Sequence, residues 1–541
     1  MPIRALLPIL ALLASLLRAQ VPDAKPGSLE GIVLNSVTSE PVKKAVVTLL
    51  GGPATKNITR ASTDAAGHFR FEDLTPGSYT VSAGGDGFVQ SFRGKGVLRP
   101  VTVADGQQVQ GVSIKLLPLA TVTGHVVDDD GDPVIRANVT ALRYQYVQGR
   151  RQLTTVGAGN TDDRGQFEIA NLSPGRYYFS ATARSMPLNL PPRTRWTHPE
   201  EVFPVTYYPS ALDAIQATPT DVSAGARLNI DFRLKKAPAY HVRGKVAGVS
   251  GRNAGNLQLA NSIGFGFPID GVTVQEDGSF DKGGNVNGSY TLTYWRPDGD
   301  VMSSVRQKVT VAGQDVNDIL LTPSAGLDIS GTVSMEGTAS SQQLTVQVSL
   351  EPVEPTGFYR GLGSGVENSG VITIHGVSPE VYRVNVFNTP PGKYVKSIRF
   401  GDRDAKNGQI DLTSGVAAPL NIVLGADGGS VSGTVENADG QPAMSAFVTV
   451  VPEGEEAGRE DLLKQATSDP NGKFEVRDIA PGKYRVFAWE EVSDGAVQSA
   501  EFRAPFESKS VSVMIGPSGS ESIKLTLISS DDIDKERSKL P

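Results

Sequence analysis

One turn-and-strand motif recurs along this chain, and it constrains the fold more than any other feature. Its clearest copy, at 467–488, reads TSDPNGKFEVRDIAPGKYRVFA. The run Asp469-Pro470-Asn471-Gly472 favours a tight turn, because Pro fixes φ at the first corner and Gly tolerates a positive φ at the exit. From Phe474 onward, apolar and charged residues alternate, as in a strand with one buried face. A second turn at Pro481-Gly482 leads into the strand of Tyr484, so the stretch predicts a strand pair.

The motif returns four more times, which indicates a tandem array. Copies at 63–82 and 161–180 are strong, and those at 275–292 and 368–384 are weaker. Each is preceded by a Gly-x-Val triplet and followed by an alternating closing strand. The triplets begin at Gly31, Gly124, Gly244, Gly331 and Gly433, and the closing strands are expected at 112–116, 228–234, 316–321, 420–424 and 523–527. Short strands with Gly/Pro turns and almost no helical period predict an all-β chain of about five β-sandwiches.

The repeats divide the chain into successive segments. We expect a signal peptide at 1–19, then sandwiches at 27–117, 118–236, 237–323, 324–426 and 427–528, and a polar tail at 529–541 that is frayed. A Tyr just after a Pro-Gly corner can bury its ring while its hydroxyl bonds to nearby backbone, as in the tyrosine corner of sandwich domains.

The repeated order of motifs resembles a known family. Gly-x-Val, Asp-Gly-x-Pro, Ala-x-Val, Thr-Asp-x-x-Gly-x-Phe and Leu-x-Pro-Gly-x-Tyr follow one another as in the carboxypeptidase regulatory-like domain. The resemblance is strongest in the first, second and fifth units. It implies a transthyretin-like, seven-stranded sandwich with an immunoglobulin-like architecture. Turn formers and core residues carry this resemblance, so it implies a fold and hardly any function.

The N-terminus and the composition indicate an exported bacterial protein. Arg4 precedes an apolar run at 5–17 and Ala19 offers a small residue for cleavage, as in a secretory signal. No later stretch approaches a transmembrane length. The chain has 0 Cys, which in an exported sandwich array favours bacteria, and we expect it in the periplasm, on the cell surface or secreted. A net charge of −7 without a basic groove argues against a nucleic-acid partner.

Several segments depart from the repeat. An insertion at 186–217, rich in aromatic residues, Arg and Pro, either forms a binding surface or folds back over its own sandwich. It ends in a helical candidate at 211–217. A second short helix is expected at 458–466. In the fourth unit, an extra strand is expected at 394–400.

No catalytic constellation emerges from the sequence. His198 and Glu201 match the H-x-x-E ligand spacing of zinc carboxypeptidases, but they lie in a Pro-rich loop and the chain lacks the α/β domain of those enzymes. The run 128–132 is acidic but lacks the spacing of a calcium loop, so it is interpreted as a solvated turn. His68 and His125 are expected to face solvent. We therefore predict no enzyme activity, no metal and no cofactor.

Carbohydrate binding is a second possibility, because sandwich modules stack sugar rings on exposed aromatic side chains. The candidate ligand-binding residues are Trp196, Tyr207, Tyr208, Trp295 and Trp489. For Trp295 and Trp489 the alternative is an aromatic side chain that caps the end of the core.

Three functional hypotheses result. The first is a non-catalytic exported scaffold, adhesion or binding protein of the cell envelope. The second is a polysaccharide-binding protein, and the third is an accessory subunit of a separately encoded peptidase or transporter. The expected partner is a polysaccharide or a cell-envelope protein, and the oligomeric state is left open.

Overall fold

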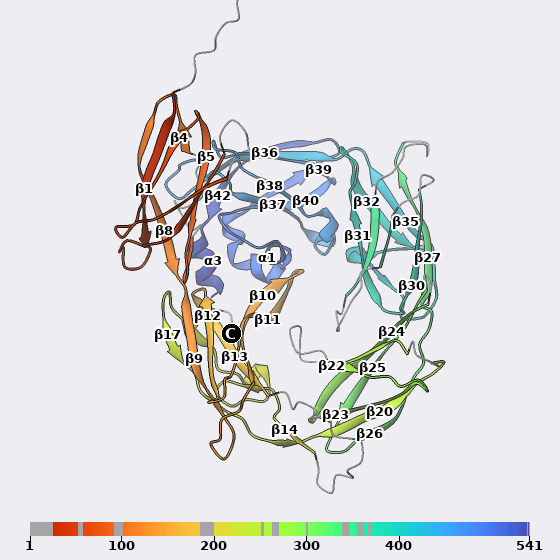
Figure 1. The fold of residues 1–541 in the computed structure, drawn as a ribbon. Coiled ribbons are helices and arrows are strands. Elements are labelled where there is room, and N and C mark those ends of the chain that lie inside the picture. The colour runs from red at the N-terminus through yellow and green to blue at the C-terminus, as the bar shows by residue number, and fades with distance from the viewer. Residues whose placement is uncertain are drawn as a thin grey trace, which may run out of the picture. The chain divides into compact units, whose positions relative to one another are not determined.

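The strands of this chain form β-sandwiches in sequence order (Figure 1). The structure is a computed structural model. It describes residues 25–51, 58–90, 101–183, 200–249, 254–261, 270–298, 301–337, 346–353, 362–365, 370–537 and 539. The predictions for the signal at 1–19 and for 186–199, including Trp196 and His198, lie outside the described residues. The described strands confirm an all-β array of about five sandwiches.

Sandwich 1 is a compact unit of its own that ends at Pro118, and a second compact unit begins at Leu119. One sheet of sandwich 1 has the order β4-β1-β8-β6 and the other β3-β2-β5-β7. Its strands are β1 (Gly27–Asn35), β2 (Val46–Gly51), β3 (Ile58–Ser62), β4 (His68–Leu74), β5 (Gly77–Gly84), β6 (Phe88–Gln90), β7 (Val101–Val103) and β8 (Gln108–Pro118).

Sandwich 2 has one sheet with the order β11-β10-β13-β15, in which β16 also pairs with β13. In the other sheet, β12 and β17 flank β9, and β18 continues the pairing of β17. Its elements are β9 (Ala120–Val127), β10 (Asn138–Val147), β11 (Arg150–Asn160), β12 (Gln166–Leu172), β13 (Gly175–Thr182), β14 (Glu201–Val202), β15 (Thr206–Tyr207), the 3₁₀ helix η2 (Ala214–Gln216), β16 (Thr220–Val222), β17 (Arg227–Asn229) and β18 (Phe232–Arg233). The short strand β19 (Ala237–Pro238) follows and pairs with β14.

Sandwich 3 packs the sheet β23-β20-β26 on the sheet β22-β21-β24-β25. Its strands are β20 (Tyr240–Val246), β21 (Asn256–Asn261), β22 (Asp270–Val272), β23 (Ser279–Asn285), β24 (Gly288–Asp298), β25 (Val301–Val311) and β26 (Val316–Leu321).

Sandwich 4 combines the sheet β30-β27-β35-β32-β33 with the sheet β29-β28-β31-β34. Its elements are β27 (Leu327–Met335), β28 (Gln347–Pro352), β29 (Leu362–Gly365), β30 (Val371–Val377), β31 (Val381–Phe387), β32 (Tyr394–Phe400), β33 (Arg403–Asp404), the 3₁₀ helix η3 (Lys406–Gly408), β34 (Gln409–Asp411) and β35 (Leu420–Gly425). The extra strand predicted at 394–400 is confirmed as β32.

Sandwich 5 joins its two sheets edge to edge, in the order β38-β37-β40-β42-β36-β39 with β41 beside β40. Its elements are β36 (Gly429–Glu436), β37 (Phe447–Pro452), the 3₁₀ helices η4 (Gly454–Glu456) and η5 (Glu460–Leu462), β38 (Lys464–Thr467), β39 (Lys473–Ile479), β40 (Gly482–Trp489), α1 (Asp494–Gln498), α2 (Ala500–Arg503), η6 (Ala504–Lys509), β41 (Val511–Ile515), β42 (Ser520–Ile528) and α3 (Ser530–Arg537). No helix in the described part of the chain is long and apolar enough to cross a membrane.

The Gly of each Gly-x-Val triplet lies where the closing strand crosses the first strand. The two strands pair in parallel in every sandwich, as β1 and β8 do in Figure 1. A Cβ on any of these glycines would come closer than 3.0 Å to a backbone oxygen of the closing segment. The five Gly–carbonyl pairs are Gly31–Val112, Gly124–Ile230, Gly244–Ile319, Gly331–Leu420 and Gly433–Ile523. The triplet therefore needs Gly for close backbone approach.

The Phe of each Asp-x-x-Gly-x-Phe motif lies opposite this glycine on the other neighbouring strand. Phe69 lies opposite Gly31 in the β1–β4 pair, and Phe474 lies opposite Gly433 in the β36–β39 pair. Sandwiches 2 and 3 repeat the arrangement, and in sandwich 4 Ile372 takes the place of the Phe. The preceding Asp starts the turn as predicted: Asp469 Oδ1 accepts hydrogen bonds from the backbone N–H groups of Asn471 and Lys473, both at 2.8 Å.

The predicted strand pair is corrected in one respect. β39 and β40 do not pair with each other: β39 pairs with β36, and β40 pairs with β37. The Pro-Gly corner therefore carries the chain from one sheet to the facing sheet. The tyrosine corner is confirmed where its bond is seen, since the hydroxyls of Tyr79, Tyr177 and Tyr290 donate to the carbonyl four residues earlier, at 2.7, 2.6 and 2.8 Å.

A buried hydroxyl group clamps the second strand in three sandwiches. Thr161 Oγ1 donates to the carbonyl of Val134 at 2.6 Å and accepts from the backbone N–H of Ala137 at 2.8 Å. Thr63 and Ser468 make the equivalent pairs in sandwiches 1 and 5. One side chain thus satisfies a donor and an acceptor that the strand ladder leaves unpaired.

Three helical predictions are corrected. The tail expected to fray contains α3, whose Ile533 is 1% exposed and packs against Trp489 and Phe506 in one cluster. The helix expected at 458–466 is replaced by η5 and β38, and the candidate at 211–217 contains only η2. α1, α2 and η6 were not predicted.

The described end of the insertion covers its own sandwich. Tyr207, Ala214 and Ala217 are buried in a cluster with Leu142 and Tyr178 of strands β10 and β13. This is the second of the two predicted alternatives.

Replacing Gly433 by Ala tests the close backbone approach. We expect Gly433→Ala to destabilise sandwich 5 by about 1–3 kcal/mol, because β36 and β42 must separate to admit the methyl group. Hydrogen exchange of peptides from β36 and β42 should accelerate. The matched control is Gly516→Ala in the same sandwich, where a Cβ meets nothing within 4 Å; equal acceleration in both variants would contradict the assignment.

A second prediction concerns the hydroxyl clamp. Thr161→Val keeps the shape but leaves two buried backbone groups unpaired, so sandwich 2 should lose about 1–3 kcal/mol. Thr161→Ser should retain most of the stability, because Ser468 makes the same bonds in sandwich 5. Hydrogen exchange of peptides from β10 and β11 measures the stability of both variants. A Val variant as stable as the Ser variant would show that the bonds contribute little.

Candidate functional site

The five aromatic side chains predicted to bind a ligand do not form one surface. Trp489 is 0% exposed, its ring stacks on Phe487, and its Nε1–H donates to Thr449 Oγ1 at 3.0 Å. Tyr207 is 3% exposed in the β13–β15 pair. Neither ring can stack on a sugar in this structure, because core side chains cover both. Tyr208 and Trp295 are partly exposed and lie in different sandwiches, and Trp196 lies outside the described residues.

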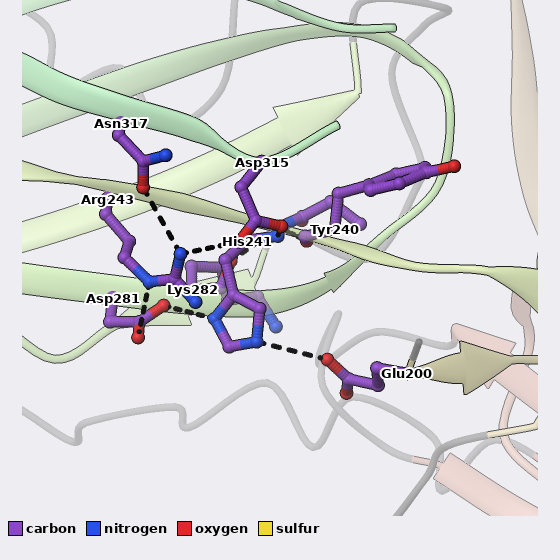
Figure 2. A network of polar contacts seen from close by, with 9 residues as sticks. Glu200, Tyr240, His241, Arg243, Asp281, Lys282, Asp315 and Asn317 are labelled. Atoms are coloured by element: carbon purple, nitrogen blue, oxygen red, sulfur yellow. Dashed lines mark hydrogen bonds and ion pairs between the residues drawn. The ribbon is translucent and has the colours of Figure 1, made fainter. Parts of the chain in front are cut away.

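A polar network on sandwich 3 brings several ionisable side chains into contact. His241 and Arg243 come from β20, Asp281 comes from β23, and Asp315 directly precedes β26 (Figure 2). In the register of the β20–β23 pair, Arg243 lies opposite Asp281. Because β20 runs between β23 and β26, side chains from three strands meet on its polar face.

His241 connects carboxylates from both sides. Its Nδ1 lies 2.5 Å from Asp281 Oδ1, and its Nε2 lies 3.4 Å from Glu200 Oε2. Its backbone N–H donates to Asp315 Oδ1 at 2.9 Å. Carboxylates from two different segments therefore lie at the two nitrogens of one imidazole ring.

Arg243 balances the negative charge of the network. Its Nε donates to Asp281 at 3.0 Å, and one terminal nitrogen donates to Asp315 at 2.6 Å and to Asn317 at 3.2 Å (Figure 2). Burial alone would lower the pKa of Arg243, but hydrogen bonds with Asp281 and then Asp315 outweigh burial and raise that pKa. The His241 backbone N–H, followed by the Arg243 guanidinium, holds the pKa of Asp315 below its ordinary value.

Glu200 belongs to the insertion of sandwich 2 and links this insertion to the network. It directly precedes β14, which pairs antiparallel with β19 in the linker to sandwich 3. The backbone N–H of Ala239 donates to the Glu200 carbonyl at 2.7 Å. The Glu200–His241 contact therefore ties sandwich 2 to sandwich 3.

This arrangement is suited to holding charges in place. Within the described ranges, no group of three or more His, Cys, Asp or Glu side chains is arranged to hold a metal ion. The sequence suggested Glu201 as a zinc ligand; its neighbour Glu200 contacts His241.

The sequence analysis missed this cluster, because it treated the histidines as separate. The sequence offered one signal for the cluster, Asp315. This residue lies one position before the predicted closing strand at 316–321, and two positions before Asn317, which an extended chain places on the same face.

Two further junctions between sandwiches use ion pairs that are mostly buried. Arg306 on β25 contacts Glu380 of sandwich 4 at 2.8 Å, with side-chain exposures of 23% and 26%. Arg383 on β31 contacts Glu460 of sandwich 5 at 2.9 Å, with exposures of 15% and 23%. Arg459 of sandwich 5 also donates to the Val395 carbonyl of sandwich 4 at 3.2 Å.

The fold and these polar junctions define a tandem β-sandwich protein. Comparison with protein families matches the carboxypeptidase regulatory-like domain to residues 28–117, 121–190 and 430–525. The matched residues lie in sandwiches 1, 2 and 5, so these three units carry carboxypeptidase regulatory-like domains. The predicted resemblance is confirmed for these three units.

Comparison with curated proteins finds no relative. Among solved structures, the Bacillus anthracis TIE protein is 11% identical with a TM-score of 0.16, over 75% of this chain and 73% of its own. A streptococcal ancillary pilin is 14% identical with a TM-score of 0.19, over 53% and 98%. The shaft pilin SpaA from Lactobacillus rhamnosus GG is 11% identical with a TM-score of 0.21, over 40% and 98%. TM-scores this low do not show a shared arrangement, so the fold is taken from the sheets themselves.

The network predicts a shift in acid stability. Because the pKa of Asp315 is lowered in the folded state, Asp315 contributes stability above its unfolded pKa of about 4 and loses it as pH falls through the lower folded value. Arg243→Gln removes one cause of this lowering. Sandwich 3 should therefore unfold at a higher pH in the variant, which hydrogen exchange of β20, β23 and β26 between pH 5 and pH 2 would measure.

The matched control is Arg477→Gln, whose guanidinium pairs with Glu475 on the exposed face of sandwich 5. It should leave the acid transition of sandwich 3 unchanged. An Arg243→Gln transition at the wild-type pH would contradict the role given to Arg243.

Proposed function

We propose that this protein is a non-catalytic, exported scaffold of the cell envelope, whose second compact unit holds sandwiches 2 to 5 at fixed spacing. The observation that carries the proposal is the placement of Arg306–Glu380 and Arg383–Glu460 at successive junctions, mostly shielded from water. Export is supported by the signal predicted at 1–19.

Buried ion pairs at a junction resist relative motion. Separating Arg383 from Glu460 leaves two poorly hydrated charges, and breaking a buried pair costs far more than breaking an exposed one. Burial raises the pKa of Glu460, which agrees with a carboxyl group held away from solvent. Flexible linkers between independent sandwiches would place such charges in water instead.

Apolar contacts support the same view of the second unit. Tyr146 on β10 of sandwich 2 packs edge-on against Phe502 on α2 of sandwich 5, with ring centroids 5.4 Å apart. Next to it, the backbone N–H of Gly149 donates to the carbonyl of Gly495 at 3.2 Å. The helices of sandwich 5, α1 and α2, thus provide a docking surface for the β10–β11 hairpin.

Distance measurements between spin labels test the scaffold. The chain has 0 Cys, so Lys245→Cys on sandwich 3 and Lys473→Cys on sandwich 5 give two labels without background. We expect a single narrow distance distribution by electron–electron double resonance. Adding Arg306→Ala and Arg383→Ala should broaden it, because both junctions lose an ion pair.

Arg477→Ala is the control, because it removes an exposed ion pair within β39. It should leave the distribution narrow. A broad distribution in the parent protein would sink the fixed spacing. Ordinary turnover of peptides, esters or glycans by the purified chain from Gln20 onward would overturn the non-catalytic part.

A further inference from the structure

Sandwich 5 contains a cavity at the same Pro-Gly corner that defines the repeat. Its volume is about 340 Å³, within the range of small-molecule sites. The corner residues 480–484 form one wall, the loop after β37 forms another, and residues 394–396 of sandwich 4 complete it. Sandwich 4 and sandwich 5 are joined here by the Arg459–Val395 hydrogen bond and by a buried contact among Tyr394, Leu462 and Ala480.

The corner tyrosine of this sandwich differs from its counterparts. In sandwiches 1, 2 and 3 the tyrosine hydroxyl donates to the carbonyl four residues earlier. Tyr484 is 1% exposed and lines the cavity, yet among the described residues none forms a hydrogen bond with its hydroxyl. The Tyr484 hydroxyl is not among the fully enclosed polar atoms without a partner, so it can bond with whatever fills the cavity.

The charges that line the cavity are already paired. Lys396 contacts Glu336 at 2.6 Å, and Lys483 contacts Glu453 at 3.6 Å. Arg459 holds Asp461 at 2.6 Å and Glu456 at 3.3 Å, and Asp427 accepts from the Tyr394 hydroxyl at 2.8 Å. Three cationic and three anionic side chains line the space, so the lining has no net charge. A charged ligand would have to break one of these pairs.

Apolar surface lies beside the polar groups. Pro452, Pro481 and Pro517 line the cavity together with Val395 and Leu462. A pyranose ring matches such a lining, because it has apolar C–H faces and hydroxyls that both donate and accept hydrogen bonds. Its hydroxyls can bond to the Tyr484 hydroxyl, to carboxylates and to ammonium groups without adding charge.

We propose that this cavity binds a neutral saccharide, one or two sugar residues at the end of a glycan, with Tyr484 as a binding residue. The site is separate from the aromatic side chains considered in the sequence, and it does not depend on fixed spacing between all four sandwiches. It gives the protein a ligand in addition to a scaffold role.

The probe is an array of neutral and acidic oligosaccharides applied to the chain from Gln20 onward. Maltose, cellobiose and N,N′-diacetylchitobiose are then titrated by calorimetry. We expect binding of a neutral saccharide that Tyr484→Phe weakens about five- to tenfold, as loss of one hydrogen bond predicts. The stability of sandwich 5 should be unchanged in this variant, because no residue in the described part of the chain forms a hydrogen bond with the hydroxyl.

Tyr177→Phe is the matched control. It removes a hydroxyl that donates to the Ser173 carbonyl, so it should destabilise sandwich 2 and leave saccharide binding unchanged. Hydrogen exchange on ligand addition should slow at 452–462 and 480–484.

Three results would overturn the proposal: no binding of any neutral saccharide, binding confined to acidic glycans, or binding that Tyr484→Phe leaves intact. Saccharide binding together with a broad distribution of spin-label distances would contradict only the proposed scaffold role.

Discussion

Each sandwich depends on one close backbone approach, in which the closing strand crosses the first strand at a glycine. At Gly433 the carbonyl of Ile523 occupies the space of a side chain, and Phe474 lies opposite this glycine on the other neighbouring strand. The Gly-x-Val triplet and the Asp-x-x-Gly-x-Phe motif are therefore two halves of one contact, although about forty residues separate them. Sandwich 4 retains the glycine at Gly331 but has Ile372 in place of the aromatic ring, which fits its weaker match to the repeat.

Much of the fold followed from local chemistry, because turns and alternation are determined within a few residues. Phe474 and Val476 are 5% and 4% exposed, as the alternation predicts, and Asp469 caps its turn. Whether two consecutive strands pair depends on distant partners, which explains the error at β39 and β40. The helices after Trp489 were missed, although Phe502 and Phe506 stand four residues apart and pack on Trp489.

The polar sites were harder to predict than the core. The partners of His241 come from β23, from the segment before β26 and from the insertion, so the cluster exists only once the register of three strands is known. The Tyr484 cavity could not be predicted from the sequence for a similar reason. The sequence repeats the corner almost unchanged, and only the hydrogen-bond partners distinguish Tyr484 from Tyr177. A repeat can therefore preserve a fold while one copy takes on a different role.

The parallel pairing of first and closing strands has a consequence for how this chain folds. Gly433 pairs with Ile523 and Gly31 pairs with Val112, which lie 90 and 81 positions apart in the sequence. In the other sandwiches the first and closing strands pair over 74 to 106 positions. Contacts this distant in sequence form slowly. Until the closing strand is available, the first strand presents an unpaired edge that can join another chain. A polypeptide emerging from its N-terminus would therefore complete one sandwich at a time, and only the newest would be exposed to aggregation.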